Sequence, residues 1–360
     1  MEYRKLGNTD LLISPLGFGT MRLPFKDQIN VTNSISLIQY AIRSGINFFD
    51  VGTFYCNFRC ETIFGQAVRN LKNNIILCAK NSSHQTVNGN WTIQLQNSLV
   101  KLDIQELDMY FIHYLDYDVW ENYFIREQHI DNIIKTKKEG LIRYLGFSSH
   151  DTPVNVRKLL DTELFDSVIL SYNLLNRTYE DTIKYACEKG YGVIIMNPLA
   201  GGMLTTDNLY INELQSIFHY DPATIALKYV YSNPYVHCTL SGMQTIEEID
   251  KNIKTAAIPH YSKEERDLID RIITSERNKK LVYCTRCEYC LPCPQGIDIP
   301  GIIDIWNRYN IIRGAKHYFR DYRLLDVTAD CCISCGLCEE KCPNGIKISA
   351  LMKEIADFFA

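Results

Sequence analysis

The sequence lacks the long apolar runs and the basic tracts that are typical of membrane-spanning and nucleic-acid-binding proteins. No apolar stretch approaches the roughly 18 residues that a spanning helix needs, and the opening MEYRKLGNTDLLIS has no apolar core of a signal peptide. The 38 lysines and arginines form no run that could neutralise a phosphate backbone, and 42 acidic residues balance them. We therefore expect a cytoplasmic protein with no membrane span and no nucleic-acid partner.

Cysteine is scarce in most of the chain and concentrated near its end. Only five of the 14 cysteines precede residue 284, whereas nine lie between residues 284 and 342. Clustering of this kind favours metal ligation over a framework of disulfides, and it indicates a reducing compartment.

The concentrated cysteines form two runs, CTRCEYCLPCP from residue 284 and CCISCGLCEEKCP from residue 331. Each run contains CxxCxxC and a later Cys-Pro, which is how bacterial ferredoxins present thiolates to 4Fe-4S clusters. In two-cluster ferredoxins the fourth cysteine of each run ligates the other cluster. This rule predicts one cluster on Cys284, Cys287, Cys290 and Cys342, and a second on Cys332, Cys335, Cys338 and Cys293.

Two features leave the pairing of these ligands open. Only two residues separate Cys290 from Cys293, where the ferredoxin pattern has three, and Cys331 offers a spare thiol beside Cys332. Paired CxxC motifs also build zinc ribbons, but a ribbon has no use for the third cysteine of each triplet. We therefore expect two 4Fe-4S clusters. Oxygen-sensitive clusters in a chain rich in Asn, Ile, Lys and Tyr suggest an anaerobic source.

The chain before these runs lacks a GxGxxG segment after its first strand, so the dinucleotide fingerprint of a doubly wound sheet is missing. Short apolar runs alternate there with longer segments of helical period, the first near Ser34 to Arg43, which predicts repeated βα units. Eight such units match a (β/α)8 barrel. The expected strands are Leu16 to Gly19, Asn47 to Asp50, Ile75 to Ala79, Met109 to His113, Leu145 to Ser148, Val168 to Ser171, Val193 to Met196 and Cys238 to Leu240.

We expect three parts along the chain. Residues 1–257 form the barrel, and a hairpin of Tyr3 to Leu6 and Leu11 to Ser14 covers its bottom. Residues 258–282 form a charged helical connector. Residues 283–360 form a ferredoxin-like module that ends in a helix near Ser349 to Phe358.

Four polar residues fall at the carboxyl ends of the second, third and fourth expected strands, where barrel enzymes carry their function. Asp50 and Tyr55 belong to FFDVGTFY, Lys80 ends LCAK, and His113 belongs to YFIHYLD. Each residue alone has an ordinary structural explanation. Four of them at corresponding strand ends point to one active site.

With these residues the chain resembles the aldo/keto reductase family, in which Asp, Tyr, Lys and His occur in this order at similar spacing. The resemblance extends to GFGTMRLP, LGFSSH, SYN, MNPLAGGML and LSGMQTIEEIDKN. Together with the cysteine runs, it is closest to the iron-sulfur-containing branch of that family.

The resemblance implies a role for each of the four residues. A tyrosine hydroxyl has an ordinary pKa near 10, so proton donation at neutral pH benefits from a nearby cation. Tyr55 would be the general acid, and Lys80 would supply the cation that Asp50 holds in place. His113 would donate a hydrogen bond to the substrate carbonyl oxygen and orient it.

The resemblance also implies a nicotinamide cofactor across the barrel mouth. Its carboxamide would be bound by Ser148, Ser149 and Asn173, and its pyrophosphate would lie near Pro198, Leu199, Gly201 and Gly202, where glycine permits close backbone approach. The adenosine end would lie near Ser241, Gly242, Met243, Glu248 and Asn252.

The adenosine end departs from the pattern of many relatives, which hold the 2'-phosphate of NADP with a Lys-Ser pair and a later Arg. This chain has Gly242, Met243 and Glu248 there, and a carboxylate repels a phosphate dianion. NAD(H) is therefore favoured over NADP(H). A degenerate site remains open, as does FMN, because a flavin converts between two-electron and one-electron transfer.

Two functions are compatible with these residues. The first is an oxidoreductase that interconverts a small carbonyl compound and its alcohol, while the clusters carry single electrons to or from the site or a ferredoxin- or flavodoxin-type partner. The second is an electron-transfer protein whose barrel is a non-catalytic docking scaffold.

Overall fold

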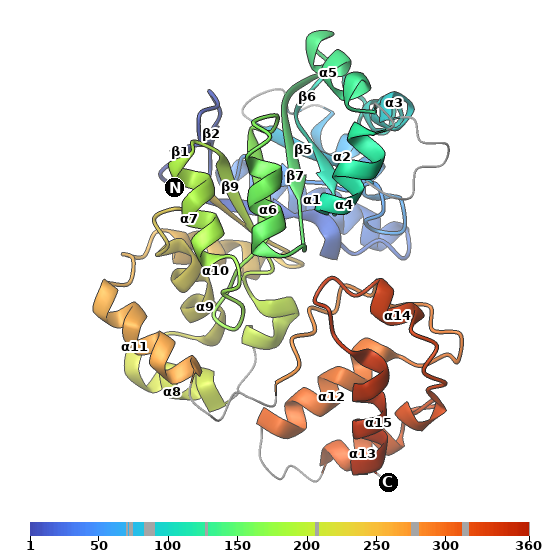
Figure 1. Cartoon of the computed structure of the whole chain (residues 1–360). Coiled ribbons are helices and arrows are strands. Elements are labelled where there is room, and N and C mark those ends of the chain that lie inside the picture. Colours follow the sequence, from blue (N-terminus) through green and yellow to red (C-terminus); the bar gives the residue numbers. More distant parts are fainter. Residues whose placement is uncertain are drawn as a thin grey trace. The chain divides into compact units, whose positions relative to one another are not determined.

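The computed structural model of the chain describes residues 1–69, 71, 75–82, 91–126, 129–205, 209–274, 281–311 and 317–359 (Figure 1). The chain divides into two compact units. The first contains residues 1–172, 177–198 and 227–260, and the second contains residues 173–176, 199–226 and 261–360. None of the helices within the described ranges is long and apolar enough to cross a membrane.

The first unit is built on a closed barrel of eight parallel strands, in the order β10-β3-β4-β5-β6-β7-β8-β9. The closed order confirms the expected barrel and excludes a doubly wound sheet, which has open edges. The strands are β3 (Leu16–Gly19), β4 (Phe48–Asp50), β5 (Ile76–Ser82), β6 (Leu107–His113), β7 (Ile142–Ser148), β8 (Ser167–Ser171), β9 (Gly192–Met196) and β10 (Cys238–Ser241).

Helices follow the strands along the chain and lie outside them (Figure 1). Local capping explains where several helices begin. Thr152 caps one helix, and Pro153 lies in its first turn, a position that favours proline. The helices of the first unit are α1 (Gln28–Arg43), α2 (Cys60–Val68), α3 (Trp91–Leu102), α4 (Tyr117–Val119), α5 (Ile130–Lys138), α6 (Pro153–Leu160), α7 (Glu180–Glu188), α9 (Pro222–Tyr231) from Leu227 onward, and α10 (Ile246–Ala256), together with η1 (Thr20–Arg22) and η3 (Trp120–Ile125).

A two-stranded hairpin precedes the barrel, as the sequence predicts. It pairs β1 (Arg4–Lys5) with β2 (Leu12–Ile13) in antiparallel register. Its buried Leu6, Leu11 and Ile13 join one apolar cluster with inward side chains of the barrel strands. The hairpin therefore fills the amino-terminal end of the barrel with apolar side chains, which leaves polar residues to gather at the strands' carboxyl ends.

The second unit has an apolar core of its own. Ile302 and Ile303 pack with Met352 and Ile355 from the last helix, and Trp306 contacts the Phe358 ring at a centroid distance of 5.3 Å. The aromatic residues between the two cysteine runs thus pack within this unit. This unit contains η4 (Ala200–Thr205), α8 (Leu209–Phe218) and the start of α9, followed by α11 (Lys263–Thr274), α12 (Ile299–Ile311), α13 (His317–Arg323), η6 (Ala329–Cys331), α14 (Leu337–Glu340) and α15 (Ile348–Phe359).

The last helix, α15, confirms the helix expected near Ser349 to Phe358. Helix α11 occupies part of the expected connector, and residues 275–280 of that connector lie outside the described residues. The division into residues 1–257, 258–282 and 283–360 stays a prediction.

Candidate active site and cluster-binding site

A buried ion pair lies at the carboxyl end of two neighbouring strands. Asp50 ends β4, and Lys80 lies on β5, two residues beyond the Cα partner of Asp50. The Lys80 Nζ is 2.9 Å from each carboxylate oxygen of Asp50, and the two residues are only 2 % and 3 % exposed. A charge buried this deeply is costly unless it is paired, so each residue requires the other.

Tyr55 completes the environment of that ammonium group. The Lys80 Nζ donates a third hydrogen bond, to the Tyr55 hydroxyl at 3.0 Å. Because the hydroxyl accepts from Lys80, its own proton can point towards another acceptor. Tyr55 comes immediately before Cys56, Asn57 and Phe58, which all have positive φ, so a left-handed turn shapes the loop after β4.

His113 lies edge-on to Tyr55. Their ring centroids are 5.8 Å apart and the rings are inclined at 87°. The structure therefore brings together all four residues that the sequence singles out, from β4, β5, β6 and the loop after β4. Their catalytic roles remain a proposal.

Charge and burial set the protonation states of these groups. Burial by itself would lower the pKa of Lys80, but the Asp50 carboxylate and Tyr55 outweigh it and raise that pKa above its ordinary value. Burial also raises the pKa of Asp50, and Lys80 opposes that effect. The pKa of His113 lies well below its ordinary value because of burial, the Lys80 ammonium and His150. At neutral pH we therefore expect an ammonium beside a neutral imidazole.

His150 is a residue that the sequence reasoning missed. It ends the LGFSSH segment, and its ring lies 5.2 Å from that of Tyr114. Burial and the Lys80 charge lower its pKa to about 4. The sequence did offer one signal for this residue, because His150 directly follows the two serines that are expected to bind the cofactor.

The two serines at the end of β7 are buried and hydrogen-bonded. The Ser148 hydroxyl accepts from the backbone N–H of Tyr114 at 3.0 Å, which leaves its proton available to donate. The Ser149 hydroxyl donates to Leu115 O at 2.6 Å and accepts from Asp151 N at 3.1 Å. Ser149 is therefore committed to the loops after β6 and β7, whereas Ser148 suits a ligand better.

At the adenosine end, Asn252 donates to the Ser241 hydroxyl at 3.1 Å, and both are buried. Met243 is also buried. The carboxylate of Glu248 accepts from Gln244 N at 2.7 Å, so it helps to cap the start of α10. The structure thus gives Glu248 a local role beside its expected effect on a phosphate.

Arg22 is a cation at this end that the sequence reasoning did not use. A Cβ added at Gly242 would lie 3.0 Å from the Arg22 Cγ, so the arginine stem runs past that glycine. Gln244 Nε2 also donates to Arg22 O at 2.7 Å. The GTMRLP segment that carries Arg22 was visible in the sequence, but its proximity to Gly242 was not.

The other expected cofactor residues are divided between the two units. Pro198 ends a stretch of the first unit, whereas Asn173, Leu199 and the two glycines belong to the second. Gly201 and Gly202 both have positive φ, at 67° and 101°, within η4. These backbone conformations explain the pair of glycines.

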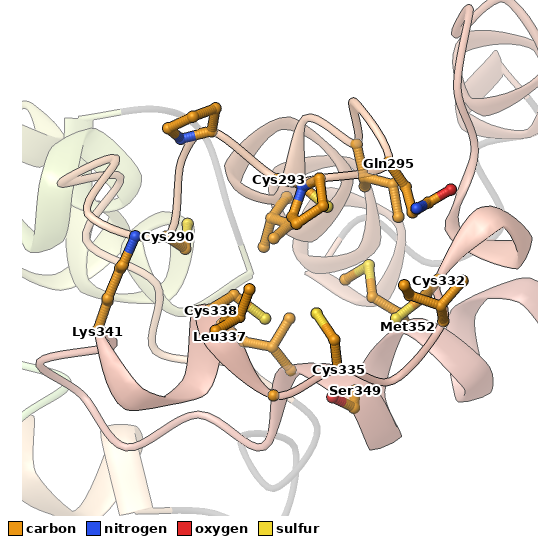
Figure 2. A pocket seen from close by; sticks show the side chains of 17 residues that line it. Cys290, Cys293, Gln295, Cys332, Cys335, Leu337, Cys338, Lys341, Ser349 and Met352 are labelled. Atoms are coloured by element: carbon orange, nitrogen blue, oxygen red, sulfur yellow. The ribbon is translucent and has the colours of Figure 1, made fainter.

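The second cysteine run surrounds a cavity of about 40 Å³ in the second unit. Figure 2 shows Cys293 facing Cys335 and Cys338 across this space, with Cys332 beside them. Cys290 and the apolar Ile297, Ile299 and Met352 also line it. A ring of thiols in an apolar setting fits a 4Fe-4S cluster, and the presence of Cys293 agrees with the ferredoxin rule.

Cys284, Cys287, Cys290 and Cys342 form a second group, of which Cys290 also lines the cavity. Burial raises the pKa of Cys284 to about 11, and the nearby thiols of Cys287 and Cys342 contribute to the rise. Burial likewise raises the pKa of Cys290 to about 12, and its thiol neighbours are Cys287, Cys284 and Cys342. Cys342 therefore lies with the first run. Within the described residues, no three such side chains converge on the point where a single metal ion would sit.

The two runs share a backbone conformation. In the first CxxC of each run, the residue before the second cysteine has positive φ (Arg286 and Ser334). The residue after that cysteine also has positive φ (Glu288 and Gly336). Turns that alternate right- and left-handed residues direct successive N–H groups inwards and form concavities that bind anionic groups, iron-sulfur clusters among them. The repetition fits two equivalent cluster sites.

The chain combines a closed parallel barrel, a polar site at its strand ends and two groups of cysteine thiols. These features define an oxidoreductase that carries its own iron-sulfur domain. Comparison with known families agrees. The sequence profile of the aldo/keto reductase family matches residues 15–274, and that of 4Fe-4S dicluster domains matches residues 283–346. The chain belongs to the aldo/keto reductase family.

Individual relatives match most of the chain. The uncharacterized oxidoreductase YqkF of Bacillus subtilis is 26% identical over 300 residues, which covers 74% of this chain and 94% of that protein. L-galactose dehydrogenase of Arabidopsis thaliana is 25% identical over 290 residues, covering 70% and 87%.

Solved structures show the same fold. The holo form of aldo-keto reductase AKR11C1 from Bacillus halodurans aligns with a TM-score of 0.66 at 24% identity, covering 76% of this chain and 96% of that one. An aldo/keto reductase from Klebsiella pneumoniae in complex with NADP and acetate aligns with a TM-score of 0.65 at 22% identity, covering 76% and 95%.

The Lys80 charge should control the titration of both histidines. We expect the double variant Asp50→Asn, Lys80→Met to raise the pKa of His113 and of His150, because the cation that opposes their protonation is gone. Both residues are changed because Lys80→Met alone would leave the Asp50 carboxylate buried without a partner. Histidine-selective NMR titration from pH 8 to well below pH 4 measures both values.

His237 is the matched control for this titration. Its pKa is also lowered to about 4, but by burial and Arg4. Its midpoint should be the same in the double variant. Unchanged midpoints for His113 and His150 would contradict the inferred electrostatic link.

The grouping of the thiols predicts which cysteine serves which cluster. The reconstituted protein should contain about eight irons per chain. Cys293→Ala should lose the cluster of the second run, Cys342→Ala that of the first, and each variant should retain about four irons with a different EPR signal after reduction. Iron analysis and EPR measure the outcome.

Cys331→Ala is the control for these variants, because Cys331 is exposed and does not line the cavity. It should retain both clusters. Loss of a cluster in Cys331→Ala, with full content in Cys293→Ala, would reverse the assignment.

Proposed function

We propose that this chain is an NAD(H)-linked oxidoreductase that interconverts a small carbonyl compound and its alcohol, with Asp50, Tyr55, Lys80 and His113 as its catalytic residues. One observation carries the proposal: the Lys80 ammonium contacts both Asp50 oxygens at 2.9 Å and the Tyr55 hydroxyl at 3.0 Å. This is the geometry that a phenolic general acid needs.

Each residue has a distinct part in the reaction. Lys80 stabilises negative charge on the Tyr55 oxygen as its proton passes to the carbonyl oxygen, and in the reverse direction as Tyr55 removes the alcohol proton. Asp50 keeps the ammonium charged in a buried position. Neutral His113 donates a hydrogen bond to the same carbonyl oxygen without adding a second cation beside Lys80.

Two bound groups complete the proposed enzyme. A nicotinamide would supply or accept the hydride, with its carboxamide at Ser148 and Asn173 and its pyrophosphate at the Gly201 loop. The 4Fe-4S clusters would carry single electrons to or from the site or a ferredoxin- or flavodoxin-type partner. Because hydride transfer moves two electrons, a converter is needed between them, and FMN remains an alternative occupant for that reason.

The first test of this proposal is Tyr55→Phe. Removal of the hydroxyl should lower kcat/KM for carbonyl reduction by about 10²- to 10⁴-fold, the range of general acid catalysis, while the iron content stays the same. Anaerobic turnover of NADH with a panel of small aldehydes and ketones measures the loss.

Tyr144→Phe serves as its control. The Tyr144 hydroxyl donates to Asp10 in an exposed network, so its loss should leave turnover intact. A wild-type protein that turns over no carbonyl, but exchanges electrons reversibly with a ferredoxin, would favour the scaffold hypothesis.

The second test addresses cofactor preference. We propose that Glu248 disfavours the 2'-phosphate of NADPH, so Glu248→Gln should raise kcat/KM for NADPH relative to NADH by about threefold to tenfold. The glutamine oxygen can still accept from Gln244 N, so the cap of α10 is retained.

Glu247→Gln removes a neighbouring charge from the same helical turn and should change the ratio little. An NADPH to NADH ratio that is equal in wild type and Glu248→Gln would show that the carboxylate does not face the phosphate.

A further inference from the structure

One short segment of the second unit joins a cluster ligand to a residue expected to bind nicotinamide. The amide Nδ2 of Asn173 donates to the Tyr283 hydroxyl at 2.6 Å, and the next residue is Cys284. Asn173 is fully buried. Both partners belong to the same compact unit.

The Asn173 side chain is oriented without Tyr283. Its Oδ1 accepts from Leu175 N at 2.9 Å and from Asn176 N at 3.0 Å, which fixes the plane of the amide. The Tyr283 hydroxyl therefore accepts from the NH2 group of the amide, which is the group that would donate to the carboxamide oxygen of a nicotinamide.

The same segment covers the Gly201 loop. A Cβ added at Gly201 would lie 2.3 Å from the backbone oxygen of Thr285, so only glycine admits this approach. Thr285 is 2% exposed. The close backbone approach that the sequence suggested for a pyrophosphate is thus made by the chain's own Thr285.

Side chains on both flanks hold the segment in place. Asn307 on α12 accepts from Val282 N at 2.9 Å and donates to Val282 O at 2.7 Å. Asn344, two residues after Cys342, donates to the Thr285 hydroxyl at 3.3 Å. A shift of residues 282–285 would therefore alter the surroundings of the first cluster's ligands.

We propose that Tyr283 is a positioning residue through which the nicotinamide site and the first cluster are coupled. Residues 282–285 and a bound dinucleotide compete for the Asn173 amide and the Gly201 loop. Binding of NAD(H) displaces the segment, and the state of the first cluster in turn changes the affinity for NAD(H), because coupling free energies are reciprocal. This inference rests on the proposed function, which puts NAD(H) at those residues.

The test uses Tyr283→Phe and NADH as the probe. The protein is first reduced with dithionite, so that added NADH has no oxidant to react with. Removal of the hydroxyl leaves one hydrogen bond fewer to break, so the Kd for NADH should fall by about twofold to tenfold. NADH fluorescence titration measures the Kd.

EPR supplies a readout that a purely structural role would not change. In the wild type, NADH should alter the signal of the first cluster, identified as the signal that Cys287→Ser abolishes, and leave the other signal unchanged. In Tyr283→Phe the alteration should be smaller. Tyr309→Phe is the control, because Tyr309 packs on Phe319 in the same unit, and it should behave as the wild type.

The outcomes separate the two proposals. NADH that binds with the same or weaker affinity in Tyr283→Phe, or that leaves both EPR signals unchanged in the wild type, overturns the coupling alone. A wild-type protein that binds no NADH overturns the nicotinamide-linked function and the coupling with it.

Discussion

The candidate active site depends on one buried ammonium ion. Lys80 is almost inaccessible to water, and a charge in that position is stable only because Asp50 binds it through both oxygens. The pair requires β4 and β5 to be neighbours in a closed barrel, with the register that puts Asp50 opposite Cys78. Burial and this same charge lower the pKa of His113 and of His150. One ion pair thus holds the Tyr55 hydroxyl and, together with burial, favours neutral imidazoles beside it.

The second unit meets a different physical requirement. Two 4Fe-4S clusters need eight thiolates on a small scaffold, and the chain provides them around an apolar core that includes Ile302 and Met352. Left-handed residues recur at Arg286 and Ser334, and turns that contain such residues can direct backbone N–H groups towards an iron-sulfur cluster. The fold of this unit therefore combines ordinary apolar packing with ligand geometry that metal binding completes.

Periodicity and strand-end position predicted much of the fold and the four catalytic candidates, because both are local properties of the chain. Boundaries were less accurate. Helix α1 begins at Gln28 rather than near Ser34, because Asp27 caps it and outweighs the weak helix propensity of its Asn- and Ser-rich first turns. Helix α8 was not predicted. His150 and Arg22 were missed, since each gains its interest from a neighbour distant in sequence.

By itself the sequence determined the barrel and predicted the cysteine ligands and the order of Asp50, Tyr55, Lys80 and His113, because spacing and period express these directly. Only the tertiary structure decided which side chains meet. It has the Glu248 carboxylate, for example, cap the start of α10. It also puts Tyr283 on Asn173, 110 residues away. Such contacts depend on how the chain packs, and packing leaves no periodic signal in the sequence.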